Sequence, residues 1–254
     1  MLKRVAVVGA TKTLLDGMRK AAKGVDVEVM PLEGGDETPP GAVALVAGRV
    51  KGEEALKAAL ALSGRHEELL ELLAEAIDCR EAFTPGNSLR VRDHATRFAR
   101  ALGLSPSDQL TLERAALVRD IGKLRVPNEI LLKDGLLTYD EWATLHTHTA
   151  LGAALLEETG ALKDTAEIVH WHHECYDGTG YPDGLEGDQI PYLARAMKIL
   201  DVYCAMTSPR RYRAGLSSHR EAEDHLRSEA GGHFDPDLVK TFLDANVGEV
   251  NADA

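Results

Sequence analysis

The sequence predicts a mainly helical domain preceded by a small α/β module, and three observations support this fold class. Apolar residues recur at helical spacing from Glu53 onward, whereas short β-branched runs are confined to residues 4–47. Helix start signals punctuate the second part, among them Ser105-Pro106 and a capping box at 138–141. A chain of 254 residues can also bury a full domain and a smaller one. We expect an α/β module over residues 1–65 and a helical domain over residues 66–254.

The first module reads as a β-α-β-β fragment. Strands are predicted at 4–8, 25–30 and 42–47, with a helix at 11–22 after the first strand. The turn that begins at Gly9 lacks both glycine-rich phosphate-binding motifs, and no aspartate ends the strands as a phosphoacceptor would. We therefore expect the module to mediate protein contacts or dimerisation, not catalysis.

The helical part divides at clear start and stop signals. A capping box at Thr138 opens a long helix that carries Trp142, Leu145, Gly152 and Leu156 on one side. The predicted helices are 53–62, 66–80, 88–102, 105–121, 138 through at least 156, 166–174, 194–206, 221–227 and 237–243.

Charge and composition exclude several classes of protein. The chain has 41 acidic and 29 basic residues, and its net charge of −12 opposes binding to nucleic acid or an anionic membrane. No apolar run approaches the roughly 18 residues of a membrane span, and we expect no signal peptide. The three cysteines, Cys79, Cys175 and Cys204, form no CxxC pair, which indicates reduced thiols and predicts a cytoplasmic protein.

Histidines concentrate in one region. Five of the ten lie between His146 and His173, and the His172-His173 pair leaves a predicted helix for a Gly-Thr-Gly turn. This pattern is typical of a metal or phosphate site. The alternative is that the pair simply ends a helix, since cationic side chains favour a helix C-terminus.

Five side chains on inward positions could bind a metal: Asp120, His148, His172, His173 and Asp201. Three imidazoles and two carboxylates suit iron or manganese better than a structural zinc ion, which favours thiolates. As structural alternatives, Asp120 could cap a helix and Asp201 could be a buried hydrogen-bond acceptor.

Periodicity cannot choose between His146 and His148, because both flank the apolar stripe of their helix on opposite sides. Gly152 lies one turn after His148 and leaves room for a close neighbour, which favours His148.

A series of motifs links these candidate ligands along the chain. The motifs are Asp120-Ile121-Gly122-Lys123, Val126-Pro127-Asn128-Glu129-Ile130-Leu131, His172-His173-Glu174, Asp177-Gly178-Thr179-Gly180-Tyr181-Pro182, Asp201-Val202-Tyr203, Arg211-Tyr212-Arg213 and Phe234-Asp235-Pro236. From about Leu69 to about Asp244 the chain thereby resembles HD-GYP domains. The resemblance implies an HD-type helical bundle and His148, with Gly152, as the ligand. Active members of that family cleave cyclic di-GMP with two or three metals, commonly iron or manganese.

The chain departs from the family pattern at four positions. Asn87 and Arg119 stand where the family has two ligand histidines. Arg119 takes the place of the histidine in the family's His-Asp pair. Phe83 stands where trinuclear members have a carboxylate, and Cys204 replaces an aspartate that usually follows Asp201-Val202-Tyr203.

By resemblance, one metal would use positions 87, 119, 120 and 201, a set that these departures damage. Arg119 is a permanent cation that can pair with Asp120 or Asp201 in place of a metal. The second metal would use Asp120, His148, His172 and His173, all present, so we expect at most one iron or manganese ion.

The resemblance also implies roles in catalysis and substrate binding. Asp120 and Lys123 are the expected catalytic residues, while Tyr181, Arg210 and Arg213 would contact the phosphates of the substrate. The two arginines could instead belong to a solvated basic loop.

Three functions fit the sequence. The first is a degenerate HD-GYP domain of bacterial cyclic di-GMP signalling, which binds this or a related nucleotide, or a partner, with little or no hydrolysis. The second is an active phosphodiesterase in which Arg119 substitutes for one metal. The third is a scaffold that binds no nucleotide. A protein partner at residues 1–65 and a homodimer are further expectations, whereas nucleic acid and membrane are not expected as partners.

Overall fold

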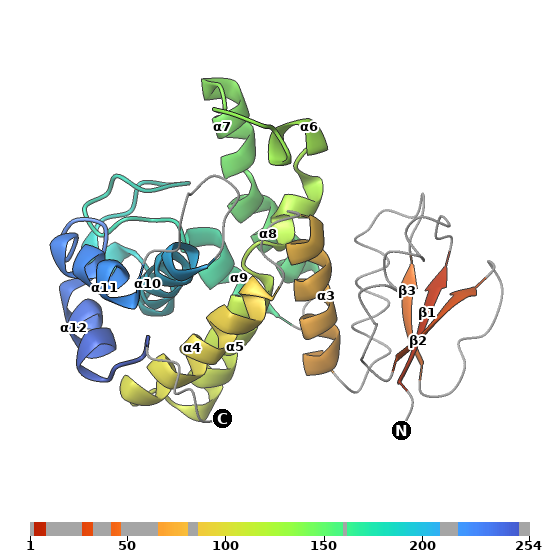
Figure 1. Cartoon of the computed structure of the whole chain (residues 1–254), viewed down its shortest axis with the longest axis horizontal. Coiled ribbons are helices and arrows are strands. Elements are labelled where there is room, and N and C mark those ends of the chain that lie inside the picture. The colour runs from red at the N-terminus through yellow and green to blue at the C-terminus, as the bar shows by residue number, and fades with distance from the viewer. Residues whose placement is uncertain are drawn as a thin grey trace. The chain divides into compact units, whose positions relative to one another are not determined.

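The computed structural model describes residues 3–8, 27–32, 42–46, 66–80, 86–159, 162–208 and 218–248 (Figure 1). The chain divides into two compact units, Met1–Leu69 and Leu70–Ala254. The predicted fold class, a helical domain after a small α/β module, is confirmed.

The first unit contains a three-stranded parallel sheet in the order β2-β1-β3. Its strands are β1 (Lys3–Val8), β2 (Val27–Leu32) and β3 (Ala42–Val46). The central strand β1 pairs along its length with both neighbours. The predicted strands are therefore present, with β2 shifted by two residues. The helices predicted at 11–22 and 53–62 lie outside the described residues.

The second unit is built from helices. Its α-helices are α3 (His66–Arg80), α4 (Asn87–Ala101), α5 (Pro106–Val118), α6 (Asn128–Leu131), α7 (Tyr139–His146), α8 (His148–Thr159), α9 (Lys163–Trp171), α10 (Tyr192–Thr207), α11 (His219–Ser228) and α12 (Pro236–Asp244). Two 3₁₀ segments, η1 (Ile121–Arg125) and η2 (Gly187–Gln189), connect them. None of the helices in the described part combines the length and apolarity that crossing a membrane requires.

Local capping chemistry sets several helix starts. The Ser105 hydroxyl accepts the N–H of Asp108 at the start of α5. Thr138 and Glu141 form the predicted capping box of α7. Because these caps satisfy N–H groups that would otherwise lack partners, they fix where each helix begins.

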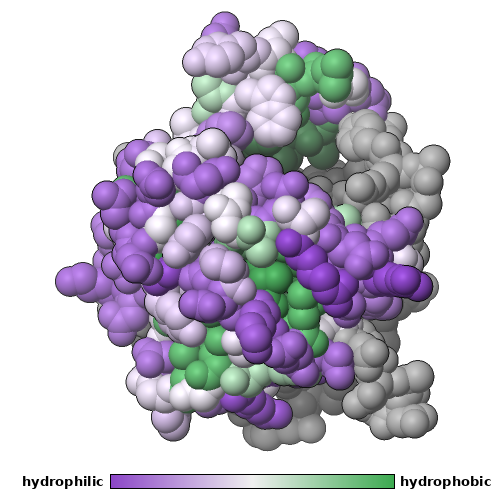
Figure 2. All heavy atoms as spheres, turned by 90° about the vertical axis from the view of Figure 1, so that its left-hand side faces the viewer, coloured by the Kyte–Doolittle hydropathy of each residue, from purple (hydrophilic) through white to green (hydrophobic). Residues whose placement is uncertain are grey.

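Helices α4, α5, α9 and α10 pack together around an apolar core. Phe98 of α4 meets Phe242 of α12 edge to face, with ring centroids 5.3 Å apart. The core includes Val91, Leu112, Ala116, Ile168, Met197, Leu200 and Tyr203. On the outside, hydrophilic side chains cover most of the face drawn in Figure 2.

Three predicted helices differ from the observed ones by three residues or more at a boundary. The helix predicted at 105–121 ends at Val118, and the one predicted at 166–174 spans Lys163–Trp171. The long helix predicted from Thr138 is two helices, α7 and α8, separated at Thr147. There the side chains of Thr147 and His148 bond to the carbonyls of Thr144 and Leu145, and such side-chain bonds compete with helix continuation.

Candidate metal and ligand site

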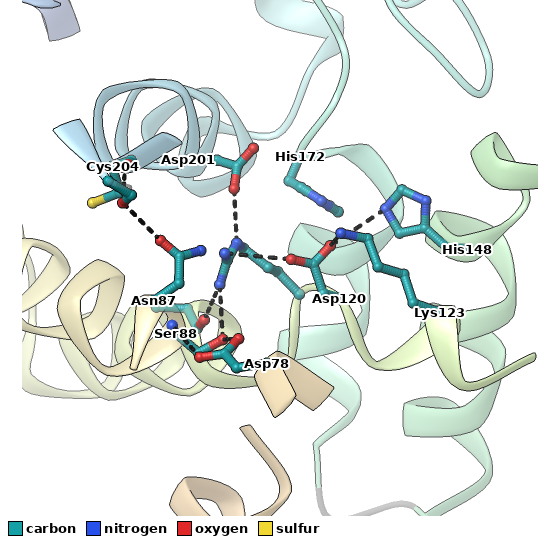
Figure 3. Close-up of polar contacts among 12 residues, drawn as sticks. Asp78, Asn87, Ser88, Asp120, Lys123, His148, His172, Asp201 and Cys204 are labelled. Atoms are coloured by element: carbon teal, nitrogen blue, oxygen red, sulfur yellow. Dashed lines mark hydrogen bonds and ion pairs between the residues drawn. The ribbon is translucent and has the colours of Figure 1, made fainter. Parts of the chain in front are cut away.

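A cleft of about 300 Å³ opens in the helical unit where several helix ends meet. The junction of α5 and η1 contributes Arg119, Asp120 and Lys123, and the start of α8 contributes His148 (Figure 3). The remaining lining residues are Asn87 of α4, Trp142 and Leu145 of α7, His173 just after α9, Tyr181, and Asp201 of α10.

Two glycines bring η1 against α8. A Cβ atom on Gly122 would lie 1.8 Å from the carbonyl oxygen of His148, and one on Gly152 would lie 3.1 Å from the backbone nitrogen of Gly122. Only a residue without a side chain fits at Gly122. The close neighbours that Gly152 accommodates are thus the Val169 side chain of α9 and η1, the segment that follows Asp120.

Asp120, His148, His172 and His173 form a compact donor cluster. One potential ligand atom from each lies within 4.8 Å of the others. The Nδ1 atoms of His148 and His172 bond to the carbonyl oxygens of Leu145 and Val169, each at 2.8 Å. Because a carbonyl only accepts, each Nδ1 carries the proton and each Nε2 offers a lone pair.

The Nε2 atoms of His148 and His172 are buried and make no hydrogen bond within the described residues. Buried polar atoms are rarely left without partners, and a metal ion would satisfy both of these. The donor set therefore fits a divalent ion bound by Asp120 and three imidazoles.

Burial sets the charge of this cluster. It lowers the pKa of His148 and of His173, and it brings the pKa of His172 from 6.5 to about 4. Burial would raise the pKa of Asp120, but Lys123 and Arg119 outweigh it and hold that pKa well below 3.8. At neutral pH the cluster thus presents neutral imidazoles and a carboxylate, the states that bind metals.

The guanidinium of Arg119 lies between two carboxylates and is only 1% exposed. Its Nε donates to Oδ1 of Asp201 at 2.8 Å, and its Nη2 lies 3.3 Å from Oδ2 of Asp120. Burial would lower the pKa of Arg119, but the two carboxylates raise it above its usual value. A fixed cation therefore occupies the side of the site where the resemblance implied a metal held by positions 87, 119, 120 and 201.

Two further residues, Ala116 and Ser88, accept hydrogen bonds from Arg119. Its Nη1 donates to the carbonyl of Ala116 at 2.8 Å and to the Ser88 hydroxyl at 3.3 Å. Ser88 in turn donates to the buried Asp78 of α3 from its hydroxyl at 2.7 Å and from its backbone N–H at 2.9 Å. Neither Ser88 nor Asp78 was predicted from the sequence as a site residue. A carboxylate directly after Ile77, within the apolar stripe of α3, was the available signal.

The other positions that depart from the family pattern have side chains unsuited to binding a metal. The amide oxygen of Asn87 accepts from Arg90 and from Ser208, each at 3.3 Å. Cys204 is buried, which raises the pKa of its thiol to about 12 and keeps it protonated. Phe83 lies outside the described residues.

The structure describes two of the four residues expected to bind the ligand, Lys123 and Tyr181. Lys123 lies 3.0 Å from Oδ1 of Asp120. The ring of Tyr181 stacks on His146 with centroids 3.7 Å apart, and burial raises its pKa so that the hydroxyl stays neutral. Arg210 and Arg213 lie outside the described residues.

Glu174, which the sequence analysis quoted without a role, shapes the loop that carries Tyr181. This glutamate is 2% exposed, and its carboxylate accepts the N–H groups of Asp183, Gly184 and Leu185. A buried charge is retained only where it is well hydrogen-bonded, as this one is.

The sequence of this chain is similar to those of known proteins. The sequence pattern of the family described as HD domain matches residues 71–238. A probable cyclic di-GMP phosphodiesterase of Vibrio cholerae is 36% identical over 206 residues, which cover 75% of this chain and 46% of that protein. The cyclic di-GMP phosphodiesterase response regulator RpfG of Xanthomonas campestris is 38% identical over 181 residues, 70% of this chain and 48% of that protein.

A solved structure has a similar fold. The crystal structure of a cyclic GMP-AMP specific phosphodiesterase of V. cholerae superposes with a TM-score of 0.55 at 20% identity, over 70% of this chain and 47% of that one. This likeness supports the fold alone. The chain spans about half the length of the curated relatives it matches.

Proposed function

The chain belongs to the HD-GYP family of HD domains, and from this premise we propose that its helical domain binds a cyclic dinucleotide but hydrolyses it weakly or not at all. The degenerate site would hold at most one metal ion, iron or manganese. Cyclic di-GMP is the first candidate ligand, because both relatives above are named as cyclic di-GMP phosphodiesterases.

The position of Arg119 carries this proposal. Its guanidinium contacts both Asp120 and Asp201 and neutralises the carboxylates that a second ion would need. Two unit charges 4 Å apart repel by about 4 kcal/mol at an effective dielectric constant of 20, and a divalent ion repels more. A metal at this position would have to displace a buried, fully bonded arginine.

The opposite side of Asp120 favours one ion. Asp120, His148, His172 and His173 would hold it, with the bare Nε2 atoms as donors. A divalent ion there would supply positive charge to a phosphate and lower the pKa of a bound water. Without a second ion, less of the negative charge that develops in phosphodiester cleavage would be stabilised.

Ligand binding is separable from hydrolysis in this cleft. Lys123 provides a cation beside Asp120, and the neutral hydroxyl of Tyr181 can donate a hydrogen bond to a phosphate. Both line the same cleft as Arg119. This local concentration of donors suits a phosphodiester despite the negative charge of the whole chain.

The test combines metal analysis, calorimetry and a turnover assay on the purified chain with manganese or iron supplied. We expect no more than one ion per chain, binding of cyclic di-GMP and little turnover. The Asn87→His/Arg119→His double variant should gain a second ion and hydrolytic activity.

Turnover by the unaltered chain at the rate of intact family members would contradict the proposal. If that turnover then fell sharply in Arg119→Ala, the arginine would be substituting for a metal in an active enzyme. Calorimetry without any binding of cyclic di-GMP would support a scaffold instead.

A further inference from the structure

Trp142 is a large aromatic side chain that neither the core nor the metal-ligand cluster uses. It lies on α7, which packs against α6 and α8 and projects from the rest of the helical unit in Figure 1. Trp142 is 48% exposed, yet it lines the same cleft as Asp120, Lys123 and Tyr181. Its indole is therefore available to a ligand in that cleft.

A row of aromatic rings joins Trp142 to the candidate metal ligands. The indole lies 5.3 Å from the ring of His146, which stacks on Tyr181 at 3.7 Å with an interplanar angle of 7°. Tyr181 lies 4.8 Å from the ring of His173 at an angle of 25°. Trp142, Tyr181 and His173 of this row line the cleft, and His146 connects the first two.

The two ends of the cleft differ in chemistry. Lys123, Arg119 and Asp120 give the inner end the charges that recognise a phosphate and a metal. Trp142, which is 48% exposed, and Leu145 add apolar surface to the lining. A nucleotide has the same division, with a charged phosphate joined through a sugar to a planar base.

We propose that Trp142 stacks on a purine base of the nucleotide whose phosphate lies at the Lys123 end of the cleft. Aromatic side chains bind bases through their faces with little dependence on hydrogen bonding, so the residue adds affinity for the base. The inference rests on the proposed function and assigns the base subsite of the same cleft.

Other exposed apolar residues on this projection do not share the position of Trp142. Tyr139, one turn earlier on α7, is 87% exposed, and Leu136 is 94% exposed; neither lines the cleft. Tyr139 is therefore a matched control for an aromatic side chain on the same helix.

The chain offers its own optical probe. It has two tryptophans, and the second, Trp171, donates from Nε1 to Asp183 at 2.8 Å and lies outside the lining of this cleft. In a Trp171→Phe variant, tryptophan fluorescence therefore reports on Trp142 alone.

Cyclic di-GMP would be titrated into the full chain by calorimetry and, in the Trp171→Phe background, by fluorescence. We expect quenching with the same Kd as calorimetry. Trp142→Ala should weaken binding by roughly ten-fold or more, Trp142→Phe by less, and Tyr139→Ala should leave Kd unchanged. Thermal unfolding would confirm that each variant is folded.

The outcomes separate this inference from the proposed function. If the unaltered chain binds cyclic di-GMP but Trp142→Ala binds equally well and no quenching occurs, the base subsite is wrong and the proposed function stands. If the unaltered chain binds no cyclic di-GMP, both are overturned. If Tyr139→Ala weakens binding as much as Trp142→Ala, the effect belongs to α7 as a whole and the stacking role of Trp142 is wrong.

Discussion

Arg119 and Asp201 form an ion pair in which Nε of the buried guanidinium donates to Oδ1 of the partly buried carboxylate at 2.8 Å. The same guanidinium lies 3.3 Å from Asp120, so a single cation is shared between two carboxylates (Figure 3). Taking such charges out of water is costly, and the pairing offsets that cost only while every partner is present. The negative charge of these carboxylates is therefore balanced by Arg119, a side chain of the protein, without a metal ion.

Removing this cation should destabilise the fold. In Arg119→Ala, Asp201 would lose its cation and Asp120 would keep only Lys123, and breaking a buried pair in this way costs about 3–5 kcal/mol. Urea denaturation of the metal-free protein would measure the loss, and added manganese should restore more stability in the variant than in the unaltered chain. Arg92→Ala is the control, because the Arg92–Glu71 pair lies near the surface, where such pairs contribute less than about 1 kcal/mol. A similarly small loss for Arg119→Ala would contradict the pairing.

Metal content should distinguish two neighbouring histidines. His148→Asn removes an unpartnered Nε2 from the donor cluster, so the ion bound per chain should fall well below that of the unaltered protein. His146→Asn changes a ring that stacks on Tyr181 and lies outside the cluster, so the metal content should persist. Elemental analysis after dialysis against limiting manganese measures both. Equal loss in the two variants would remove His148 from the ligand set.

Local chemistry explains why much of the fold could be predicted from the sequence. The helix at 66–80 has the predicted bounds, and the caps at Ser105 and Thr138 act as expected. Each of these features depends on residues a few positions apart. The separation at Thr147 was missed because the apolar spacing continues through it, while the bonds that accompany it come from individual side chains.

The candidate site was harder to predict because its contacts span the chain. Periodicity left His146 and His148 open, and His148 was favoured through Gly152 and the family resemblance. In the structure, His148 belongs to the donor cluster of Asp120, and its backbone packs against Gly122. The pairing of Arg119 with Asp120 or Asp201 was expected through the family resemblance, and the structure shows both contacts. The bond of Arg119 to Ser88, and of Ser88 to Asp78, was not predicted. Those choices follow from tertiary packing.

The stability of the metal-free protein should depend on pH through His172. Its pKa is about 4 in the folded chain and 6.5 ordinarily, so between these values the unfolded chain binds the proton more readily. The contribution of His172 to the free energy of unfolding is therefore fully present above pH 6.5 and is lost as the pH falls toward 4. At roughly 1.4 kcal/mol per pKa unit, the loss is up to about 3 kcal/mol. Urea midpoints measured across this range with a chelator present would test it. His172→Asn should give a flatter profile, and an unchanged slope in that variant would contradict the assignment.

The contact between η1 and α8 predicts a sharp difference between two glycines. In Gly122→Ala the new methyl group would lie 1.8 Å from the carbonyl oxygen of His148, so the backbone that carries Asp120 and His148 must separate. Overpacking of this kind typically costs about 1–3 kcal/mol, and the displaced donors should also bind manganese more weakly. Gly232→Ala is the control, because its methyl group would come no closer than 3.5 Å to the neighbouring atoms. Urea denaturation and manganese titration measure the two effects. If Gly122→Ala matched Gly232→Ala in both, the backbone contact would not be what aligns Asp120 with His148.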